Sequence, residues 1–521
     1  MRRSEPGKEQ SLSGQVTIHD LIQVGSDDDV AISGIGRSPL TYRDLRVQVG
    51  QVVESLNNLG VGRNDRVAIV LPNGPEMAAA FVSIACCATT APLNPLYTKE
   101  EFNFYLSDLD AKVVVVRQGT DSPVVTAARE QNVAVVELCA DEDQPAGTFT
   151  LMASDPPPTS SSVKSGLASP DDIALVLHTS GTTSRPKIVP LSHANVCASA
   201  GNIQNTLGLE ASDVSLNVMP LFHIHGLMAA VLATLGKGAS VVAAPGFDAL
   251  KFFGWLDQAK PTWYSAVPTM HQAILKRAKR NQEIIDRTRL RFIRSSSSSL
   301  PPQVLLELEK TFGVPVVEAY AMTEASHQMT CNQLPPGDRK PGTVGCAAGP
   351  EVAIMDESTS DLLSQGTIGE VVIRGSNVTK GYENNPQANS ECFVDSWFRT
   401  GDQGVMDEDG YLTITGRLKE IINRGGEKIS PREVDDVLMD HEAIQQVVTF
   451  AMPHKSLGEE VVAAVVLRDG FVAEEADIRK FAAARLAPFK VPRKVLVVDE
   501  IPKGPTGKLQ RIGLAEKLGL T

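Results

Sequence analysis

Hydrophobic residues recur at helical spacing near the start of the chain, in residues 41–60. The stripe consists of Leu45, Val49, Val52, Leu56 and Leu59. This spacing is typical of a helix that buries one face. Thr41 and Asp44 at its start resemble a capping box, and Gly60 stands just past its end. The pattern predicts an amphipathic helix.

Short apolar runs alternate with helical segments after this helix. The runs are "DRVAIVLPN" (65–73), "KVVVV" (112–116), "VAVVEL" (133–138) and "IALVLH" (173–178). This alternation favours layered α/β structure with parallel strands. The apolar stretch "MAAAFVSIACCATTAPL" is too short and too rich in small polar residues to span a membrane, so we expect a buried helix there.

A second alternating stretch follows, and its strand-like runs are 238–244, 261–268, 290–300 and 315–327. Glycine-flanked β-hairpin patterns come next, at 366–382 and 410–418. The last hundred residues resemble a compact unit whose first helix begins with Ser430 as N-cap, Pro431 at N1 and Glu433 at N3.

The predicted fold class is therefore α/β. Residues 1–416 would form a large N-terminal domain of layered α/β subdomains with a β-hairpin subdomain. Residues 417–521 would form a small, mobile C-terminal α+β domain. We place the boundary near residues 417–420, because a charged, glycine-flanked segment between two packed units is where hinges lie.

The charge balance narrows the classes of partner. Lys and Arg total 49 against 62 Asp and Glu, and the formal charge is −13. An acidic chain disfavours nucleic acid and anionic membranes as partners. The seven cysteines show neither CxxC nor zinc-ligand spacing. We expect reduced thiols and a cytoplasmic protein without a membrane span.

The stretch "LHTSGTTSRPKIVPLSHAN" (177–195) concentrates hydroxyl groups and glycine beside one lysine. Such a loop can hold phosphate oxygens with backbone N–H groups and hydroxyls, while Lys187 supplies charge. It lacks the Gly-Lys-Ser/Thr ending of a Walker A loop. Taken alone, a loop of this composition is more often only a connection.

Five further motifs decide between these readings: "PLFHIHGL" (220–227), "EAYAMTEASH" (318–327), "WFRTGD" (397–402), "GRLKEIINRGGEKISP" (416–431) and "PKGPTGKLQR" (502–511). Together with "SGTTSRPK" and in this order, they resemble the adenylate-forming superfamily of acyl-CoA synthetases, luciferases and adenylation domains. Within that family the chain is most similar to the oxalate–CoA ligases of plants and a related yeast peroxisomal synthetase.

The resemblance implies a role for each motif residue in binding ATP. Asp402 would accept both ribose hydroxyls, Arg417 would reach the ribose or a phosphate, and Tyr320 would stack on adenine. Thr323 and Glu324 would bind the α-phosphate and Mg²⁺, with Glu324 as the metal ligand. The loop residues Thr179, Ser180, Gly181, Thr182, Thr183 and Lys187 would hold the β- and γ-phosphates.

The resemblance also assigns the C-terminal motifs. Lys508 would bridge the substrate carboxylate and the α-phosphate during adenylation. Lys419 would be the hinge about which the small domain swings. Gly425 and Gly426 would then admit the pantetheine arm of coenzyme A, although a Gly-Gly pair is also compatible with a simple turn. The chain departs from the family at Ile188, where glycine is usual, and at Ser184.

The acyl pocket is expected between "PLFHIHGL", "RSSSSSL" and "ASHQM". Ser297 and His327 would hold a second carboxylate of a very short acid, and His223 would gate or wall the site. A serine run can also be a flexible loop, and either histidine can be a structural residue. The substrate is thus predicted to be oxalate or another small polar acid.

Alternative functions remain open at the level of sequence. The chain could take medium-chain fatty acids or 4-coumarate, or load an acyl group onto a carrier protein instead of coenzyme A. A nucleotide-binding protein without catalysis is disfavoured by the intact Lys508, Glu324 and Asp402. The oligomeric state, monomer or homodimer, is also open.

Overall fold

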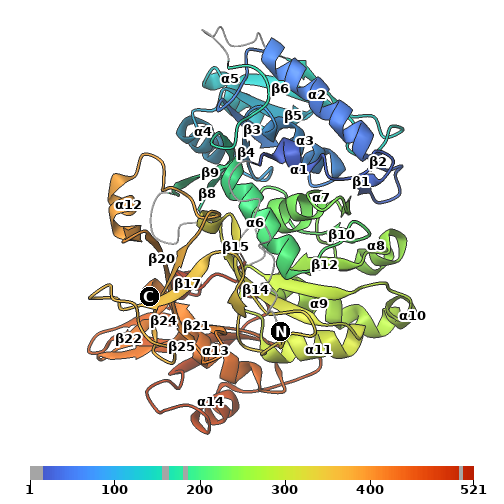
Figure 1. The fold of residues 1–521 in the computed structure, drawn as a ribbon. Helices are drawn as coiled ribbons and strands as arrows, with labels where there is room; N and C mark the ends of the chain where they lie inside the picture. Colours follow the sequence, from blue (N-terminus) through green and yellow to red (C-terminus); the bar gives the residue numbers. More distant parts are fainter. Residues whose placement is uncertain (1–15, 155–163, 180–185, 504–508, 521) are drawn as a thin grey trace, which may run out of the picture.

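Two large β-sheets form the body of the protein. The computed structural model describes residues 16–154, 164–179, 186–503 and 509–520 (Figure 1). The first sheet has seven strands in the order β7 (Thr150–Ala153), β6 (Ala134–Cys139), β5 (Val113–Arg117), β3 (Arg66–Val70), β4 (Thr89–Pro92), β8 (Ile173–His178) and β9 (Ile188–Ser192). Strands β6, β5, β3, β4 and β8 run parallel, as the alternating pattern predicts.

The second sheet has nine strands. Their order is β16 (Cys346–Ala347), β15 (His327–Cys331), β14 (Val316–Met322), β13 (Phe292–Ser296), β12 (Trp263–Ala266), β10 (Val214–Asn217), β11 (Ser240–Ala243), β1 (Val30–Gly34) and β2 (Leu40–Thr41). From β1 to β14 the neighbouring strands are parallel. In parallel α/β sheets, ligands bind at the carboxyl ends of the strands.

Helices fill the space between the two sheets and cover their outer faces. The inner layer contains α3 (Pro75–Ala85), α6 (His193–Thr206) and the π-helix η1 (His225–Leu232). Helix α6 contacts both β8 of the first sheet and β15 of the second. Phe81 of α3 and Trp263 of β12 belong to the same buried cluster, so one apolar core joins the two sheets.

The helix α7 (Ala233–Leu235) continues η1, and α1 (Ile18–Leu21) contacts α3 and α6. The body also contains α2 (Tyr42–Asn58), α4 (Lys99–Asp108), α5 (Pro123–Glu130), α8 (Phe252–Ala259), α9 (Pro268–Ala278), η2 (Lys279–Asn281), α10 (Gln282–Asp286), α11 (Pro302–Phe312), η3 (Thr323–Ala325) and α12 (Pro386–Cys392). The predicted helix at 41–60 is α2, and its stripe is buried from Leu45 to Leu56, while Leu59 is the partly buried C-cap. The Thr41 hydroxyl accepts from the Asp44 N–H and donates to the Asp44 carboxylate, in place of the full capping box.

Two smaller antiparallel-rich sheets complete the chain. One contains β17 (Glu351–Met355), β18 (Gly369–Arg374), β20 (Trp397–Met406), β19 (Phe393–Val394) and β21 (Leu412–Arg417). The other contains β23 (Glu427–Ile429), β22 (Ile422–Arg424), β25 (Gly458–Leu467), β24 (Ile444–His454) and β26 (Lys494–Val497). Helices α13 (Pro431–Met439), α14 (Glu475–Ala483) and α15 (Leu514–Lys517) accompany the last sheet. The turn η4 (Leu418–Glu420) connects the two sheets.

Several local predictions are refined by the structure. The stretch beginning at Met77 is not one helix, because α3 ends at Ala85 and residues 89–92 form β4. Residues 366–382 and 410–418 supply β18 and β21, and each of these strands pairs antiparallel with β20. The predicted N-cap is confirmed: Ser430 Oγ accepts from the Glu433 N–H at the start of α13. The α/β fold class is confirmed.

Candidate active site

Three residues predicted to bind the nucleotide meet at one point. Asp402 on β20 lies opposite Arg417 on β21, and the Arg417 Nε–H donates to Asp402 Oδ1 over 2.8 Å. The Tyr320 hydroxyl, on β14, donates to the other carboxylate oxygen of Asp402. Burial keeps the pKa of Tyr320 well above its usual value, so the hydroxyl keeps its proton. The Asp402 carboxylate raises the pKa of Arg417.

A bulge in β20 aims the Asp402 carboxylate. Gly401 has a φ of +73°, which favours glycine, and the pairing of β18 with β20 shifts register here. The Gly401 N–H donates to the Glu370 carboxylate, and the Asp402 N–H donates to Thr400 Oγ1. Bulges commonly redirect a side chain next to a binding site. The "TGD" motif therefore fixes the orientation of the Asp402 carboxylate.

Glu324 and Lys187 approach each other through Tyr382, a residue that the sequence motifs did not single out. Tyr382 Oη donates to Glu324 Oε1 over 2.7 Å, and Lys187 Nζ lies 4.4 Å from the centre of the Tyr382 ring. Burial raises the pKa of Glu324, while Tyr382, Arg417 and Lys187 oppose that shift. Thr323, next to Glu324 in η3, is partly exposed. The two motifs thus face one shared region.

The loop predicted to hold phosphates is anchored where it begins and ends, at Thr179 and Lys187. The Thr179 N–H donates to the Lys187 carbonyl over 3.0 Å, and the Lys187 N–H donates to Thr179 Oγ1 over 3.2 Å. Ser180, Gly181, Thr182 and Thr183 lie outside the described residues, as does Ser184. Ile188, which replaces the usual glycine, is buried at the start of β9 opposite His178. Its bulk is accommodated by an apolar cluster.

Ser297 lies directly after β13 with a φ of +75°. Its hydroxyl lies 3.0 Å from Nδ1 of His225, and the His225 ring stacks on His327 with 5.0 Å between ring centres. His223 instead accepts the His225 N–H at the start of η1. The histidine bonded to Ser297 is therefore His225. Ser326 and His327, with φ of +48° and +100°, adopt uncommon backbone conformations of the kind that cluster at functional sites.

The π-helix brings His225 this close to the strands. At Gly226 a Cβ atom would lie 2.7 Å from the Pro220 carbonyl oxygen, so only glycine permits this approach. A π-helix is uncommon and often found at functional sites.

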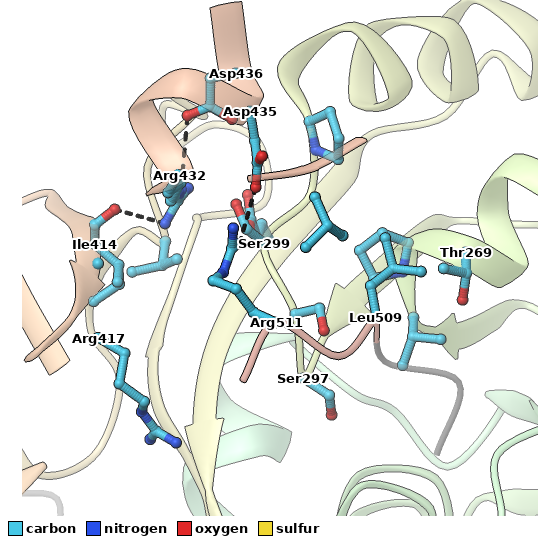
Figure 2. A pocket seen from close by; sticks show the side chains of 18 of the residues that line it. Thr269, Ser297, Ser299, Ile414, Arg417, Arg432, Asp435, Asp436, Leu509 and Arg511 are labelled. Carbon is cyan, nitrogen blue, oxygen red and sulfur yellow. Dashed lines mark hydrogen bonds and ion pairs between the residues drawn. The ribbon is translucent and has the colours of Figure 1, made fainter. Parts of the chain in front are cut away.

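A cavity of about 380 Å³ joins these groups to the C-terminal part of the chain. Ser297, Tyr320, Asp402 and Arg417 line it on one side, and Arg432, Asp435, Leu509 and Arg511 line it from the C-terminal part of the chain. Figure 2 shows Ser297 and Arg417 with these four C-terminal residues. Arg511 Nη2 donates to Asp435 over 2.9 Å, and Arg432 Nη1 donates to the Ile414 carbonyl over 2.7 Å. Burial raises the pKa of Asp435 to about 6. Lys508 lies outside the described residues, but its neighbour Leu509 lines the cavity.

The predicted hinge and coenzyme A residues lie elsewhere. Lys419 is exposed in η4, between β21 and β22. Gly425 and Gly426 form the turn between β22 and β23, with φ of +61° and +96°. Neither glycine is among the residues that line the cavity. In this arrangement the cavity is faced by Arg511 and Leu509 rather than by the glycine turn.

The sequence motifs did not assign Tyr382 or His225 to the site, although both lie in stretches that the sequence pattern singles out. Tyr382 ends the glycine-flanked stretch 366–382, and His225 is the second histidine of "PLFHIHGL". Arg294 precedes the serine run as a single charged residue in an apolar strand pattern, which is unusual for a buried strand.

The chain matches known proteins along its length. Residues 23–383 match the AMP-binding enzyme family, and residues 433–508 match the C-terminal domain of AMP-binding enzymes. An oxalate–CoA ligase of Arabidopsis thaliana is 45% identical over 93% of this chain and 94% of its own length. An oxalate–CoA ligase of Saccharomyces cerevisiae is 43% identical over 94% and 95%. A probable CoA ligase of Humulus lupulus is 44% identical over 97% of each chain.

Solved structures have the same fold as this chain. ATP-bound MatB from Rhodopseudomonas palustris superposes with a TM-score of 0.85 at 28% identity, covering 96% of this chain and 98% of its own. The apo structure of MatB gives 0.76. No helix within the described ranges is both long and apolar enough to cross a membrane. The chain belongs to the AMP-binding enzyme family within the adenylate-forming superfamily, and it is an acid–thiol ligase that uses ATP and coenzyme A.

Proposed function

We propose that this ligase activates oxalate. The observation that carries the proposal is the polar wall of the acyl side of the cavity, where Ser297 is supported by His225 and His327. A wall of hydroxyl groups, with buried imidazole groups behind it, suits a second carboxylate, whereas an acyl chain or aromatic ring requires apolar walls. The names of two relatives at 43% and 45% identity support the same substrate.

The roles proposed for the nucleotide residues follow from their geometry. Asp402, held by Tyr320 and Arg417, offers a fixed anion for two vicinal ribose hydroxyls. We assign the adenine face to Tyr320, the α-phosphate to Thr323, and the β- and γ-phosphates to Lys187 with the loop 179–183. Lys187 Nζ lies 4.4 Å from the centre of the Tyr382 ring, a place from which it would reach the phosphates.

Mg²⁺ would be held by Glu324. The described residues contain no group of three His, Cys, Asp or Glu side chains suited to a metal. A magnesium ion that arrives on ATP phosphates needs only one or two protein carboxylates, and a buried Glu324 beside Lys187 meets that requirement. The ion would supply charge neutralisation of the phosphates.

The reaction has two halves. One oxalate oxygen attacks the α-phosphorus of ATP, the bond to the bridging oxygen breaks, and pyrophosphate leaves with that electron pair. The thiolate of coenzyme A then attacks the acyl carbon, and AMP leaves. In the first half, the Lys508 ammonium would stabilise the negative charge shared by the carboxylate and the α-phosphate.

Residues 417–521 are proposed to move as a unit about Lys419 between the two halves. Lys419 lies exposed in a short turn between two sheets, the setting in which a few residues absorb a domain rotation. The turn at Gly425 and Gly426 would then replace Leu509 and Arg511 at the cavity. We expect a cytoplasmic enzyme that uses free coenzyme A.

A panel of acids tests the proposal. AMP release would be measured with oxalate, malonate, acetate, hexanoate and 4-coumarate, each with coenzyme A and with a carrier protein bearing phosphopantetheine. Oxalate is expected to give the highest kcat/KM, and free coenzyme A is expected to stimulate pyrophosphate release. A preference for hexanoate or 4-coumarate by orders of magnitude contradicts the polar-pocket proposal. Indifference to coenzyme A contradicts the choice of acceptor.

A further inference from the structure

Arg294 is a fully buried cation in the middle of β13. The strand register places it beside Ser265 of β12 and Val317 of β14. Glu318, the nearest carboxylate in that register, pairs with Ser295, so it points to the opposite face of the sheet. Across the parts of the chain that the structure describes, Arg294 forms no ion pair with a carboxylate.

Among the residues that the structure describes, the side-chain hydrogen-bond partners of Arg294 are all neutral groups. Its Nη2 donates to Gln328 Oε1 over 3.1 Å, and its Nη1 lies 3.4 Å from Ser265 Oγ and 3.5 Å from His225 Nε2. Its Nε finds no hydrogen-bond partner within the described residues. Burial lowers the pKa of Arg294 to about 10, which leaves it charged at neutral pH. A buried charge without a counter-ion destabilises the folded protein. A functional role would explain why an arginine occupies this position.

The donors around His225 determine which ring nitrogen carries the proton. Arginine only donates, so Ser265 Oγ accepts from Arg294 and directs its own proton to His225 Nε2, 2.6 Å away. Because Nε2 accepts from Ser265 and faces Arg294, the neutral ring carries its proton on Nδ1. Nδ1–H then donates to Ser297 Oγ over 3.0 Å. The Ser297 hydroxyl proton is left to point into the cavity that Ser297 lines.

We propose that Arg294 is a positioning residue for substrate choice: through Ser265 and His225 it fixes Ser297 as a hydrogen-bond donor to the second carboxylate of a small dicarboxylate. Its buried positive charge also favours a dianion over a monoanion in the same pocket. We call the hydrogen-bonded chain from Arg294 through Ser265 and His225 to Ser297 the relay. The His327 ring stacks on His225 and so holds the His225 ring in position. The inference rests on the proposed function, since it explains how the site would recognise the second carboxylate.

Steady-state kinetics test the relay first. Arg294→Met is expected to raise the KM for oxalate about tenfold or more, with a smaller change in kcat and an unchanged KM for ATP, because the lost donor acts on substrate binding. Ser265→Ala, which removes one hydroxyl, is expected to shift KM in the same direction by less. Arg280→Met, at an exposed position, is the matched control. Equal changes for oxalate, acetate and ATP would overturn the proposal.

A second readout does not depend on the substrate. With ¹⁵N-labelled histidine, long-range ¹H–¹⁵N spectra are expected to show the Nδ1–H form of His225 in the wild type and a loss of that form in Arg294→Met. The spectrum of Ser265→Ala answers the same question if Arg294→Met does not fold. A wild-type His225 with its proton on Nε2 would refute the relay even if oxalate is the best substrate.

Rescue separates positioning from a structural role. His225→Asn places an amide N–H where Nδ1 stands, and this group donates to Ser297 whether or not Arg294 is present. In the Arg294→Met background, His225→Asn is expected to recover at least threefold in KM for oxalate. No recovery, with a folded double variant, counts against the proposal. Absence of oxalate turnover in the wild type would defeat the proposed function instead, and the spectra would still decide the relay.

Discussion

Arg417 Nε lies 2.8 Å from Oδ1 of Asp402, across the register of β20 and β21. Arg417 is the last residue of β21, and the turn η4, which contains Lys419, follows it directly. The residue that fixes the proposed ribose carboxylate is therefore also the residue from which the C-terminal part of the chain departs. The proposed nucleotide site and the start of the C-terminal part therefore share this contact.

Asp402→Asn tests the ribose assignment. The amide retains the shape and a partner for the Tyr320 hydroxyl, but it loses the charge that faces Arg417 and one acceptor for the ribose hydroxyls. We expect the KM for ATP to rise about 10- to 100-fold, since hydrogen bonds to a charged group contribute about 1.5 to 3 kcal/mol. Glu351→Gln, which breaks an exposed pair with Arg374, is the control. An unchanged KM for ATP contradicts the assignment.

Tyr382→Phe tests the link between Glu324 and Lys187. The change keeps the ring beneath Lys187 and removes only the hydroxyl that donates to Glu324. We expect kcat for acyl-adenylate formation to fall about tenfold and the Mg²⁺ concentration for half-maximal rate to shift, because Glu324 loses its orientation. Pyrophosphate release followed across a magnesium titration measures both. If neither quantity changes, Glu324 does not act through Tyr382.

Lys508→Ala tests the proposed catalytic lysine. We expect acyl-adenylate formation to fall at least a thousandfold while ATP binding, measured by calorimetry, changes little, because the ammonium acts on charge that develops during the reaction. Lys503→Ala, five residues earlier and paired with Glu500, provides the matched control. A wild-type rate in Lys508→Ala would remove the lysine from the mechanism.

The Glu318→Gln variant is expected to be more stable than the wild type at high pH. Burial raises the pKa of Glu318 to about 7, and Oε1 accepts from the Leu300 N–H. Because the folded-state pKa exceeds the ordinary value of 4.5, the protonated carboxyl stabilises the fold below about pH 4.5. That stabilisation is lost as the pH rises through about 7.

The glutamine variant keeps the acceptor without the charge. At pH 8 we expect it to unfold at a higher temperature than the wild type, with a gain in stability of about 1 to 3 kcal/mol that shrinks to below about 1 kcal/mol at pH 5. Thermal unfolding followed by circular dichroism at both pH values checks this, with the exposed Glu307→Gln as control. A gain of equal size at pH 5 and pH 8 would show that ionisation of Glu318 is not its cause.

The sequence by itself determined the local elements of this protein. The apolar stripe of α2, the β-branched runs of β3, β5 and β8, and the Ser430 cap depend on neighbours within a few residues, so periodicity and capping chemistry predict them. The ordered motifs also identified the family and the residues assigned to ATP. Where one apolar run contained both α3 and β4, periodicity could not separate them.

Only the tertiary structure decided which side chains meet. Tyr382 reaches Glu324 across 58 residues, and His225 reaches Ser297 across 72. Arg294 faces Ser265 and Gln328 instead of Glu318 because of strand order and register, and a shift of one residue would place it on the other face. Such contacts depend on sheet topology, which local patterns do not encode. The sequence therefore named the motifs, while packing around the π-helix selected His225 as the partner of Ser297 and placed Arg294 beside His225.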